Sequence, residues 1–192
     1  VVAIGGGSPM DAAKAIAVLA RNDGPCADFF GRDKFPNRNL PVIAVPTTSG
    51  TGSEVTPYAV ITNTAENIKR TVAGRHLFPR VALLDPELAS TMPRRVTVNT
   101  GLDALSQGME GMLSLKNTPL GDVLALELCR VVRTWLPRAA ADGSDLEARK
   151  WMMHAAMLSG CVIAQSGTTL VHGMGYYFTR EFAMAHGLAN AF

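Results

Sequence analysis

The sequence contains few cysteines, and this excludes two classes of small protein. Three cysteines occur among its 192 residues: Cys26, Cys129 and Cys161, all far apart in the chain. An odd number of cysteines without CxxC spacing is typical neither of a disulfide framework nor of a zinc ribbon. We therefore expect a reduced, cytoplasmic protein.

The sequence also lacks an excess of charge of either sign and a long apolar run. Lys and Arg number 18 and Asp and Glu number 16, so the formal net charge is +2. Such a balance gives no general attraction to nucleic acid or to an anionic membrane. No segment reaches the roughly 18 uninterrupted apolar residues of a spanning helix. We expect neither a nucleic-acid nor a membrane partner.

The residue patterns predict an α/β part followed by an all-α part. Hydrophobic residues make up 47% of the chain, enough for one large domain or two small ones. Short β-type runs alternate with a helical stretch, which favours a sheet with parallel pairing. We expect strands at residues 1–4, 41–45, 55–62 and 81–84 and a helix at 8–20. From about Thr97 the apolar residues recur at helical spacing, so we place the domains at 1–95 and 96–192.

The first glycine-rich loop, Gly5 to Ser8, follows a strand and opens a helix. Glycines permit positive φ and close approach of a ligand to the backbone. Ser8 suits the N-cap position, and Asp11 lies three residues later, as in a capping box. Free amides at such a helix start suit a pyrophosphate. The loop matches neither GxGxxG nor GxxxxGK[ST], so a tight turn that binds nothing is the alternative.

The second loop, residues 46–54, also follows a strand and is rich in hydroxyl groups. Its candidate ligand-binding residues are Thr47, Thr48, Thr51 and Ser53. The alternative is an ordinary Ser/Thr/Gly surface loop. Ligands of open α/β sheets gather at the carboxyl ends of the strands. Because both loops follow strands, we expect them to form one cleft.

The helical part carries a polar constellation. Asp103 and Gln107 are spaced i, i+4 with Glu110 one turn further, so the three share a helix face. His172 and His186 come much later, and each precedes a glycine. One carboxylate and two imidazoles suit a divalent first-row metal. A buried histidine or a capping aspartate is the alternative interpretation of each residue taken singly.

Taken in order, the motifs resemble the iron-containing (group III) alcohol dehydrogenase family. The matching segments are Gly5-Gly6-Gly7-Ser8-x-x-Asp11-x-x-Lys14, Pro46-Thr47-Thr48-x-Gly50-Thr51-Gly52-Ser53-Glu54, Asp85-Pro86, Gly101-Leu102-Asp103-Ala104-Leu105, His172-Gly173 and His186-Gly187-Leu188-Ala189-Asn190-Ala191. Together they run from one end of the chain to the other. The resemblance implies a dehydroquinate synthase-like architecture: a Rossmann-like dinucleotide-binding α/β domain, then an all-α domain, with the active site between them. It also implies that this chain is an internal fragment, incomplete at both ends.

By the same resemblance, the enzyme is an NAD(P)-dependent alcohol dehydrogenase or aldehyde reductase. Its substrate is a small alcohol, aldehyde or ketone, and the full-length protein is a homodimer. The choice between NAD and NADP as cofactor stays open. The residues implied to bind the cofactor are Gly6, Gly7, Ser8, Asp11, Thr47, Thr48, Thr51, Ser53 and Lys69. The implied ligands of the metal, Fe²⁺ in preference to Zn²⁺, are Asp103, Gln107, His172 and His186. The implied catalytic residues are Asp103, His172, Tyr176 and His186.

The sequence departs from the family pattern at two positions. Gln107 replaces a ligand that is usually histidine, and an amide oxygen coordinates a metal more weakly than imidazole does. Tyr176 replaces a histidine associated with proton transfer, and its hydroxyl is the candidate substitute. These departures keep two alternatives open: a metal-independent reductase of the same fold acting on an oxo-acid, and a non-catalytic nucleotide-binding homologue.

Overall fold

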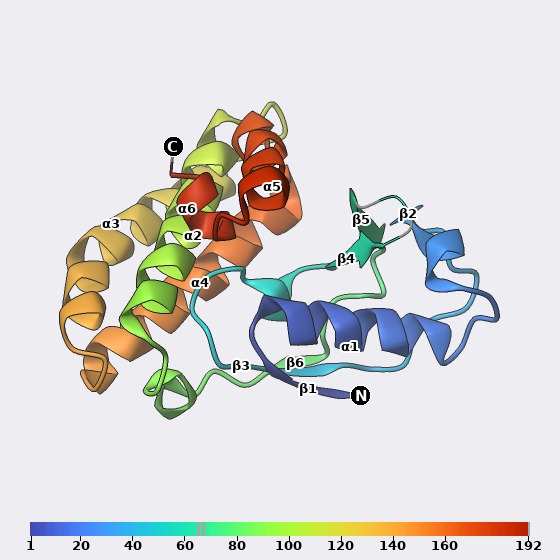
Figure 1. Cartoon of the computed structure of the whole chain (residues 1–192), viewed down its shortest axis with the longest axis horizontal. Helices are drawn as coiled ribbons and strands as arrows, with labels where there is room; N and C mark the ends of the chain where they lie inside the picture. The colour runs from blue at the N-terminus through green and yellow to red at the C-terminus, as the bar shows by residue number, and fades with distance from the viewer. Residues whose placement is uncertain (65, 67, 192) are drawn as a thin grey trace. The chain divides into compact units, whose positions relative to one another are not determined.

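The structure, a computed structural model, describes residues 1–64, 66 and 68–191. These residues form two compact units. The first comprises Val1–Pro46 and Ser53–Leu84, and the second comprises Thr47–Gly52 and Asp85–Phe192. Figure 1 labels the helices and strands of both units. None of the helices in the described part is long and apolar enough to cross a membrane.

The first unit contains two small sheets and one long helix. One sheet is parallel, with strand order β1-β3-β6; the other has the order β2-β5-β4. The strands are β1 (Val2–Gly5), β2 (Gly31–Arg32), β3 (Ile43–Pro46), β4 (Tyr58–Asn63), β5 (Ile68–Ala73) and β6 (Val81–Ala82). The helices are α1 (Gly7–Leu19) and the 3-10 turns η1 (Cys26–Phe29) and η2 (Ser53–Val55).

Helix α1 packs through a stripe of residues at helical spacing. Met10, Ala13, Lys14, Ala17 and Val18 are all buried, and the i, i+3, i+4, i+7 pattern puts them on one face. Met10, Ala13 and Ala17 contribute to a core cluster with the strand residues Ala3 and Ala44. Lys14 lies on the same buried face although its side chain ends in an amine.

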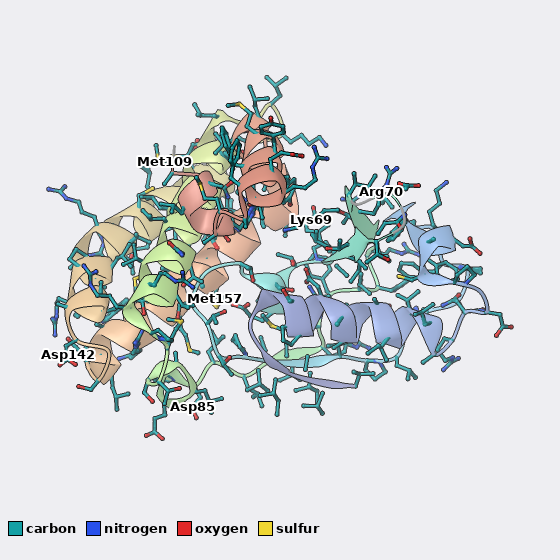
Figure 2. All side chains as sticks on the ribbon, viewed as in Figure 1. Lys69, Arg70, Asp85, Met109, Asp142 and Met157 are labelled. Carbon is teal, nitrogen blue, oxygen red and sulfur yellow. The ribbon has the colours of Figure 1, made fainter. Side chains whose placement is uncertain are left out.

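The sheet β2-β5-β4 differs in one respect from the expected parallel pairing. Strand β4 begins at Tyr58, three residues after the expected start, and pairs antiparallel with β5. The sequence pattern did not predict β5 because two adjacent charged residues, Lys69 and Arg70, interrupt its apolar alternation. Figure 2 labels both side chains on this strand. Parallel pairing holds for β1 with β3 and for β3 with β6, so the α/β class is confirmed.

The second unit is helical. It consists of the 3-10 turn η3 (Pro86–Ala89) and the helices α2 (Arg94–Leu113), α3 (Pro119–Ala141), α4 (Leu146–Ser166), α5 (Leu170–Phe182) and α6 (His186–Ala189). The starts of α3 and α4 are capped by their own N-cap residues: Thr118 Oγ1 accepts from Gly121 N, and Asp145 accepts from Ala148 N. Each cap satisfies a backbone donor that the helix itself leaves unpaired.

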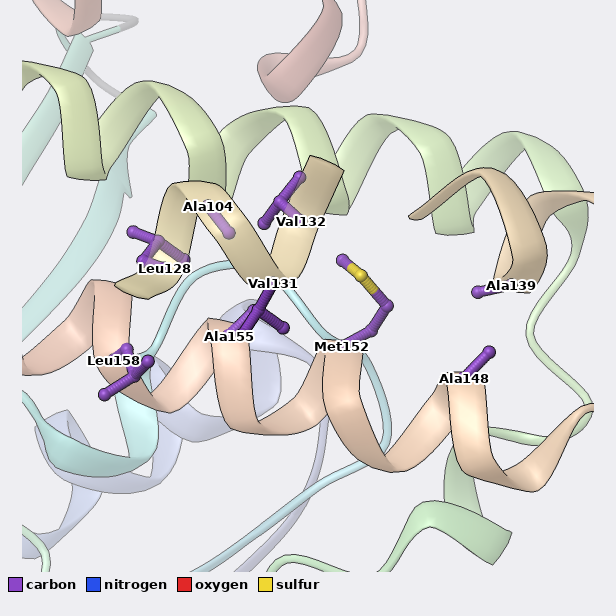
Figure 3. Packing of buried hydrophobic residues seen from close by; sticks show 9 residues of the cluster. All are labelled: Ala104, Leu128, Val131, Val132, Ala139, Ala148, Met152, Ala155 and Leu158. Atoms are coloured by element: carbon purple, nitrogen blue, oxygen red, sulfur yellow. The ribbon is translucent and has the colours of Figure 1, made fainter. Parts of the chain in front are cut away.

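The core of this unit lies among α2, α3 and α4 (Figure 3). Leu128 and Val131 of α3 pack with Met152 and Ala155 of α4 and with Ala104 of α2. Helix α2 approaches its neighbours closely because it carries glycines. A Cβ at Gly101 or Gly108 would overlap leucine side chains of α3, and one at Gly111 would overlap Val162 of α4. This close packing fixes α2, the helix that carries Asp103.

Candidate active site

Three side chains from three helices of the second unit converge on one point. Asp103 comes from the middle of α2, His172 from the first turn of α5, and His186 from the first residue of α6. Their ligand atoms all lie within 4.8 Å of one another. Nε2 of His172 is 3.4 Å from Oδ1 of Asp103, and Nε2 of His186 is 3.7 Å from the same oxygen. Metal–ligand bonds of about 2.1 Å in a tetrahedral arrangement separate the ligand atoms by about 3.4 Å, so this cluster fits a divalent cation.

Two glycines allow α5 and α6 to reach these positions. A Cβ at Gly187 would overlap the carbonyl oxygen of Asn99 in α2 and would lie 3.1 Å from Cβ of Asp103. A Cβ at Gly175 would overlap Oδ1 of Asn190. The glycine after His186 is therefore required by close packing, whereas Gly173, after His172, has nothing within 4 Å of its Cβ position.

Two buried amides border the cluster. Gln107 donates from Nε2 to Oδ2 of Asp103 at 3.3 Å. Asn190 donates to Oδ1 of Asp103 at 3.0 Å, and its Nδ2 lies 3.3 Å from Nε2 of His172 and 3.4 Å from Nε2 of His186. The oxygens of both amides are buried without a hydrogen-bond partner among the described residues. In both amides the nitrogen faces the cluster, and Oδ1 of Asn190 lies toward Gly175. An amide oxygen would face a cation at this point only after the amide group turned over, and the interchange of O and N is the one change this requires.

Glu110, seven residues after Asp103 on α2, contacts His172 from the other side. One of its oxygens accepts from the backbone and hydroxyl of Thr169, and the other contacts Nδ1 of His172. Burial opposes ionisation of Glu110, but these hydrogen bonds lower its pKa to about 2. Burial would likewise lower the pKa of His172, but its hydrogen bonds to Asp103 and Glu110 raise that pKa to about 9.

Tyr176 lies one turn after His172 on α5. Its ring stacks on His186, with centroids 5.1 Å apart and planes inclined by 7°. The ring of His172 meets it edge-on at 6.5 Å. Tyr176 therefore borders the cluster directly, and a role in proton transfer stays a prediction.

The glycine-rich loop of the first unit leaves its sheet at the expected place. Gly5, at the end of β1, pairs in register with Pro46, at the end of β3, so the segments that follow start at the same edge. The prediction of Ser8 as N-cap is wrong: Gly6 is the N-cap of α1, and no side chain caps this helix. Ser8 lies inside the first turn because helical geometry already begins at Gly7. The amides of that turn are thus left without a side-chain acceptor, as an anion site requires.

Asp11 and Ser53 belong to a buried network around Lys14 instead of a capping box. The Lys14 amine, fully buried, donates to the carbonyl oxygens of Ser53 at 2.6 Å and Tyr58 at 2.7 Å and to Oγ of Ser53 at 2.8 Å. Asp11 accepts from Oγ of Ser53 at 2.7 Å and from the backbone N–H of Val60 at 3.0 Å. Burial lowers the pKa of Lys14 to about 8 and raises the pKa of Asp11. The network fastens α1 to the segment from Ser53 to Val60.

The other expected cofactor-binding residues lie in two places. Thr47, Thr48 and Thr51 are in the second unit, where their loop packs on helices. Ser159 of α4 donates to the carbonyl oxygen of Gly50 at 3.1 Å, and a Cβ at Gly52, which has a φ of +61°, would overlap the backbone of α4. Lys69 is exposed on β5, where it pairs in register with Thr62. The roles of these residues toward a cofactor stay predictions.

Sequence reasoning assigned no role to three residues of these networks: Lys14, Glu110 and Asn190. Lys14 and Asn190 stood inside recognised motifs, and Glu110 shared a helix face with Asp103 and Gln107. The available signal for a buried polar contact was a charged or amide residue at a helix position that the apolar periodicity marks as buried. Their long-range partners could not be read from the sequence: Ser53 is 39 residues from Lys14, Thr169 is 59 from Glu110, and Asp103 is 87 from Asn190.

Comparison with known proteins identifies the family. Residues 1–86 match the family model described as iron-containing alcohol dehydrogenase, and residues 97–192 match the model described as Fe-containing alcohol dehydrogenase family, C-terminal. The chain therefore belongs to the iron-containing alcohol dehydrogenase family. This confirms the resemblance inferred from the motifs.

Individual relatives match along almost the whole chain. The NAD-dependent methanol dehydrogenase of Bacillus methanolicus is 38% identical over 190 residues, covering 99% of this chain and 50% of that protein. An iron-containing alcohol dehydrogenase structure from Thermotoga maritima is 47% identical, with a TM-score of 0.91 over 98% of this chain and 51% of that one. Sulfoacetaldehyde reductase from Bifidobacterium kashiwanohense, solved with NAD⁺, is 39% identical, with a TM-score of 0.94 over 98% and 50%. The chain spans about half the length of the relatives it matches.

Proposed function

We propose that the full-length protein is an NAD(P)-dependent oxidoreductase that interconverts a small alcohol and its aldehyde or ketone. The observation that carries the proposal is the convergence of Asp103, His172 and His186 from three helices within 4.8 Å. Relatives named for methanol, 1,3-propanediol and sulfoacetaldehyde support a short substrate, whereas one relative is named for long-chain alcohols. The relative solved with NAD⁺ supports a nicotinamide dinucleotide as cofactor.

Asp103, His172 and His186 would hold the metal, with iron favoured because the donor set is one carboxylate and two imidazoles. Gln107 and Asn190 border the same point through their amide nitrogens. Gln107, whose oxygen has no hydrogen-bond partner among the described residues, is the proposed fourth ligand once its amide turns that oxygen toward the metal. When bound, a divalent cation supplies Lewis-acid polarisation of the substrate oxygen. Tyr176, stacked on His186, would provide a hydroxyl for proton transfer at the substrate oxygen.

For the dinucleotide, the uncapped first turn of α1 would bind the pyrophosphate through the amides of Gly6, Gly7 and Ser8. Thr47, Thr48, Thr51, Ser53 and Lys69 would contact the rest of the cofactor. The dinucleotide supplies the hydride chemistry, and the protein supplies binding and orientation. Asp11 would act by holding Ser53, to which it is hydrogen-bonded.

We also propose that the protein works as a homodimer in the cytoplasm. Within the described part of the chain no disulfide joins Cys26, Cys129 or Cys161, which suits a reducing compartment.

An assay of NAD(P)H oxidation with short aldehydes, before and after chelation, tests the function. We expect turnover that is lost on chelation and restored by Fe²⁺ or Zn²⁺. Turnover that survives complete metal removal would favour the oxo-acid reductase alternative, and cofactor binding without any turnover would favour a non-catalytic homologue.

A further inference from the structure

Glu110 is a buried carboxylate whose two oxygens have different hydrogen-bond partners. Its exposed fraction is 2%, and within the described part of the chain its ion-pair partner is His172 instead of a lysine or arginine. A buried carboxylate is costly unless its acceptor positions are used.

The two oxygens of Glu110 have separate partners. Oε1 accepts from the backbone N–H and the hydroxyl of Thr169, both at 2.7 Å, and from the backbone N–H of His172 at 3.3 Å. Thr169 is the N-cap residue of α5 and makes no side-chain cap bond of its own. Oε1 therefore caps this helix from α2, while Oε2 contacts Nδ1 of His172.

This arrangement determines which nitrogen of the His172 ring carries hydrogen. An ionised carboxylate only accepts hydrogen bonds, so Nδ1 must be the donor. The lone pair of the neutral ring is then on Nε2, the atom that lies 3.4 Å from Asp103 and 3.3 Å from Asn190. A histidine that binds a metal through one nitrogen commonly donates from the other to a carboxylate.

We propose that Glu110 is a positioning residue of the metal centre, which fixes the start of α5 through Oε1 and selects the metal-binding tautomer of His172 through Oε2. The inference rests on the proposed metal site at Asp103, His172 and His186 and assigns a function to a residue outside the ligand set. Its two halves are separable because a different oxygen carries each.

Glu110→Gln separates the two halves. Three donors converge on Oε1, so the glutamine oxygen stays there, and its NH₂ replaces Oε2. That group donates to Nδ1, which must become the acceptor, and the hydrogen of the neutral ring moves to Nε2. The helix cap is retained while the lone pair that faces Asp103 is lost.

The measurements are the affinity of the purified full-length protein for Co²⁺, by chelator competition, and the ring ¹⁵N shifts of His172 in the metal-free protein, followed in a pH titration up to the plateau at which the ring is neutral. We expect Glu110→Gln to weaken Co²⁺ binding by about 10- to 100-fold, to reverse the tautomer and to keep the wild-type melting temperature within a few degrees. Thr169→Val, which removes one bond to Oε1 and leaves Oε2 untouched, is the matched control and should bind Co²⁺ within about 3-fold of wild type.

Unchanged Co²⁺ affinity in Glu110→Gln with the Nδ1–H tautomer retained would overturn the inference and leave the proposed function standing. Equal weakening in Thr169→Val would also overturn it, because the effect would then come from the helix cap. Failure of the wild type to bind any metal would instead contradict the proposed function. In that case the ¹⁵N shifts still decide: a tautomer that reverses supports the role of Glu110, and one that does not refutes it.

Discussion

The glycines that follow His172 and His186 provide a matched test of how packing positions the histidines. The Cβ position of Gly187 is blocked by α2, whereas that of Gly173 has nothing within 4 Å. A Cβ at Gly187 would overlap the carbonyl oxygen of Asn99 and would lie 2.7 Å from its carbonyl carbon, whereas ordinary contacts begin at 3.4 Å. Relieving the carbon contact alone requires about 0.7 Å (3.4 minus 2.7), and the oxygen contact, which is closer, requires more, so Gly187→Ala must move α6 away from α2. Metal–ligand distances vary by only about 0.2 Å from their ideal values. In Gly187→Ala, His186 would therefore lie too far from Asp103 for both residues to bind the same metal ion. We expect affinity for a divalent metal to fall by about 100-fold or more, beyond the usual effect of an outer-shell change.

The assay is a chelator-competition titration with Co²⁺ on wild type, Gly187→Ala and Gly173→Ala, with a thermal melt of each. Gly173→Ala has open space for its Cβ and should bind Co²⁺ like the wild type. Its melting temperature should be equal or higher, because alanine is favoured over glycine inside a helix by about 1 kcal/mol. Equal Co²⁺ affinity in the two variants would refute the reasoning that close packing of α6 on α2 positions His186.

The buried side chains of Lys14 and Arg149, and the lowered pKa of Lys14, give further predictions. Lys14→Met leaves Asp11 and two carbonyl oxygens without their buried partner, so the free energy of unfolding, measured with denaturant, should fall by about 3–5 kcal/mol. The control Lys150→Met, at an exposed lysine, should lower it by at most about 0.5 kcal/mol. The pKa of Lys14 is lowered from 10.5 to about 8, so between these values the unfolded chain binds a proton that the folded protein does not. The stability of wild type relative to Lys14→Met should therefore rise with pH across that window, by at most about 1.4 kcal/mol per pH unit; a fall would contradict the assignment. Arg149→Met removes the donors to Met92 O, Thr97 Oγ1 and Gly143 O and should cost roughly 3 kcal/mol without changing Co²⁺ affinity; a loss of affinity in the folded variant would contradict that separation.

The parts of the fold that the sequence predicted are those with a clear local period. Apolar runs predicted β1 and β3, and the buried stripe of α1 repeats at helical spacing, so the α/β class followed from short-range pattern. Strand β5 was missed because Lys69 and Arg70 make its alternation irregular, and the antiparallel partner of β4 was missed with it. Ser8 was wrongly taken as N-cap because capping preference alone does not determine at which residue a helix begins.

The site was visible in the sequence only where its residues stand in motifs. Asp103, His172 and His186 were recognisable by type and by the glycines beside the histidines, and the structure brings them together. Glu110 and Asn190 are joined to their partners over 62 and 87 residues, and no local pattern encodes such contacts. Their roles therefore became visible only when the packing of α2, α5 and α6 was known.

The most direct test of the central claim is the metal content of the purified full-length protein and of its Asp103→Ala variant, both prepared anaerobically and measured by elemental analysis. Asp103 supplies the carboxylate shared by both histidines, so the account predicts about one iron or zinc per chain in the wild type and close to none in a folded Asp103→Ala. Equal metal content in the two proteins, or a wild type that oxidises NAD(P)H with an aldehyde while holding no metal, would contradict it.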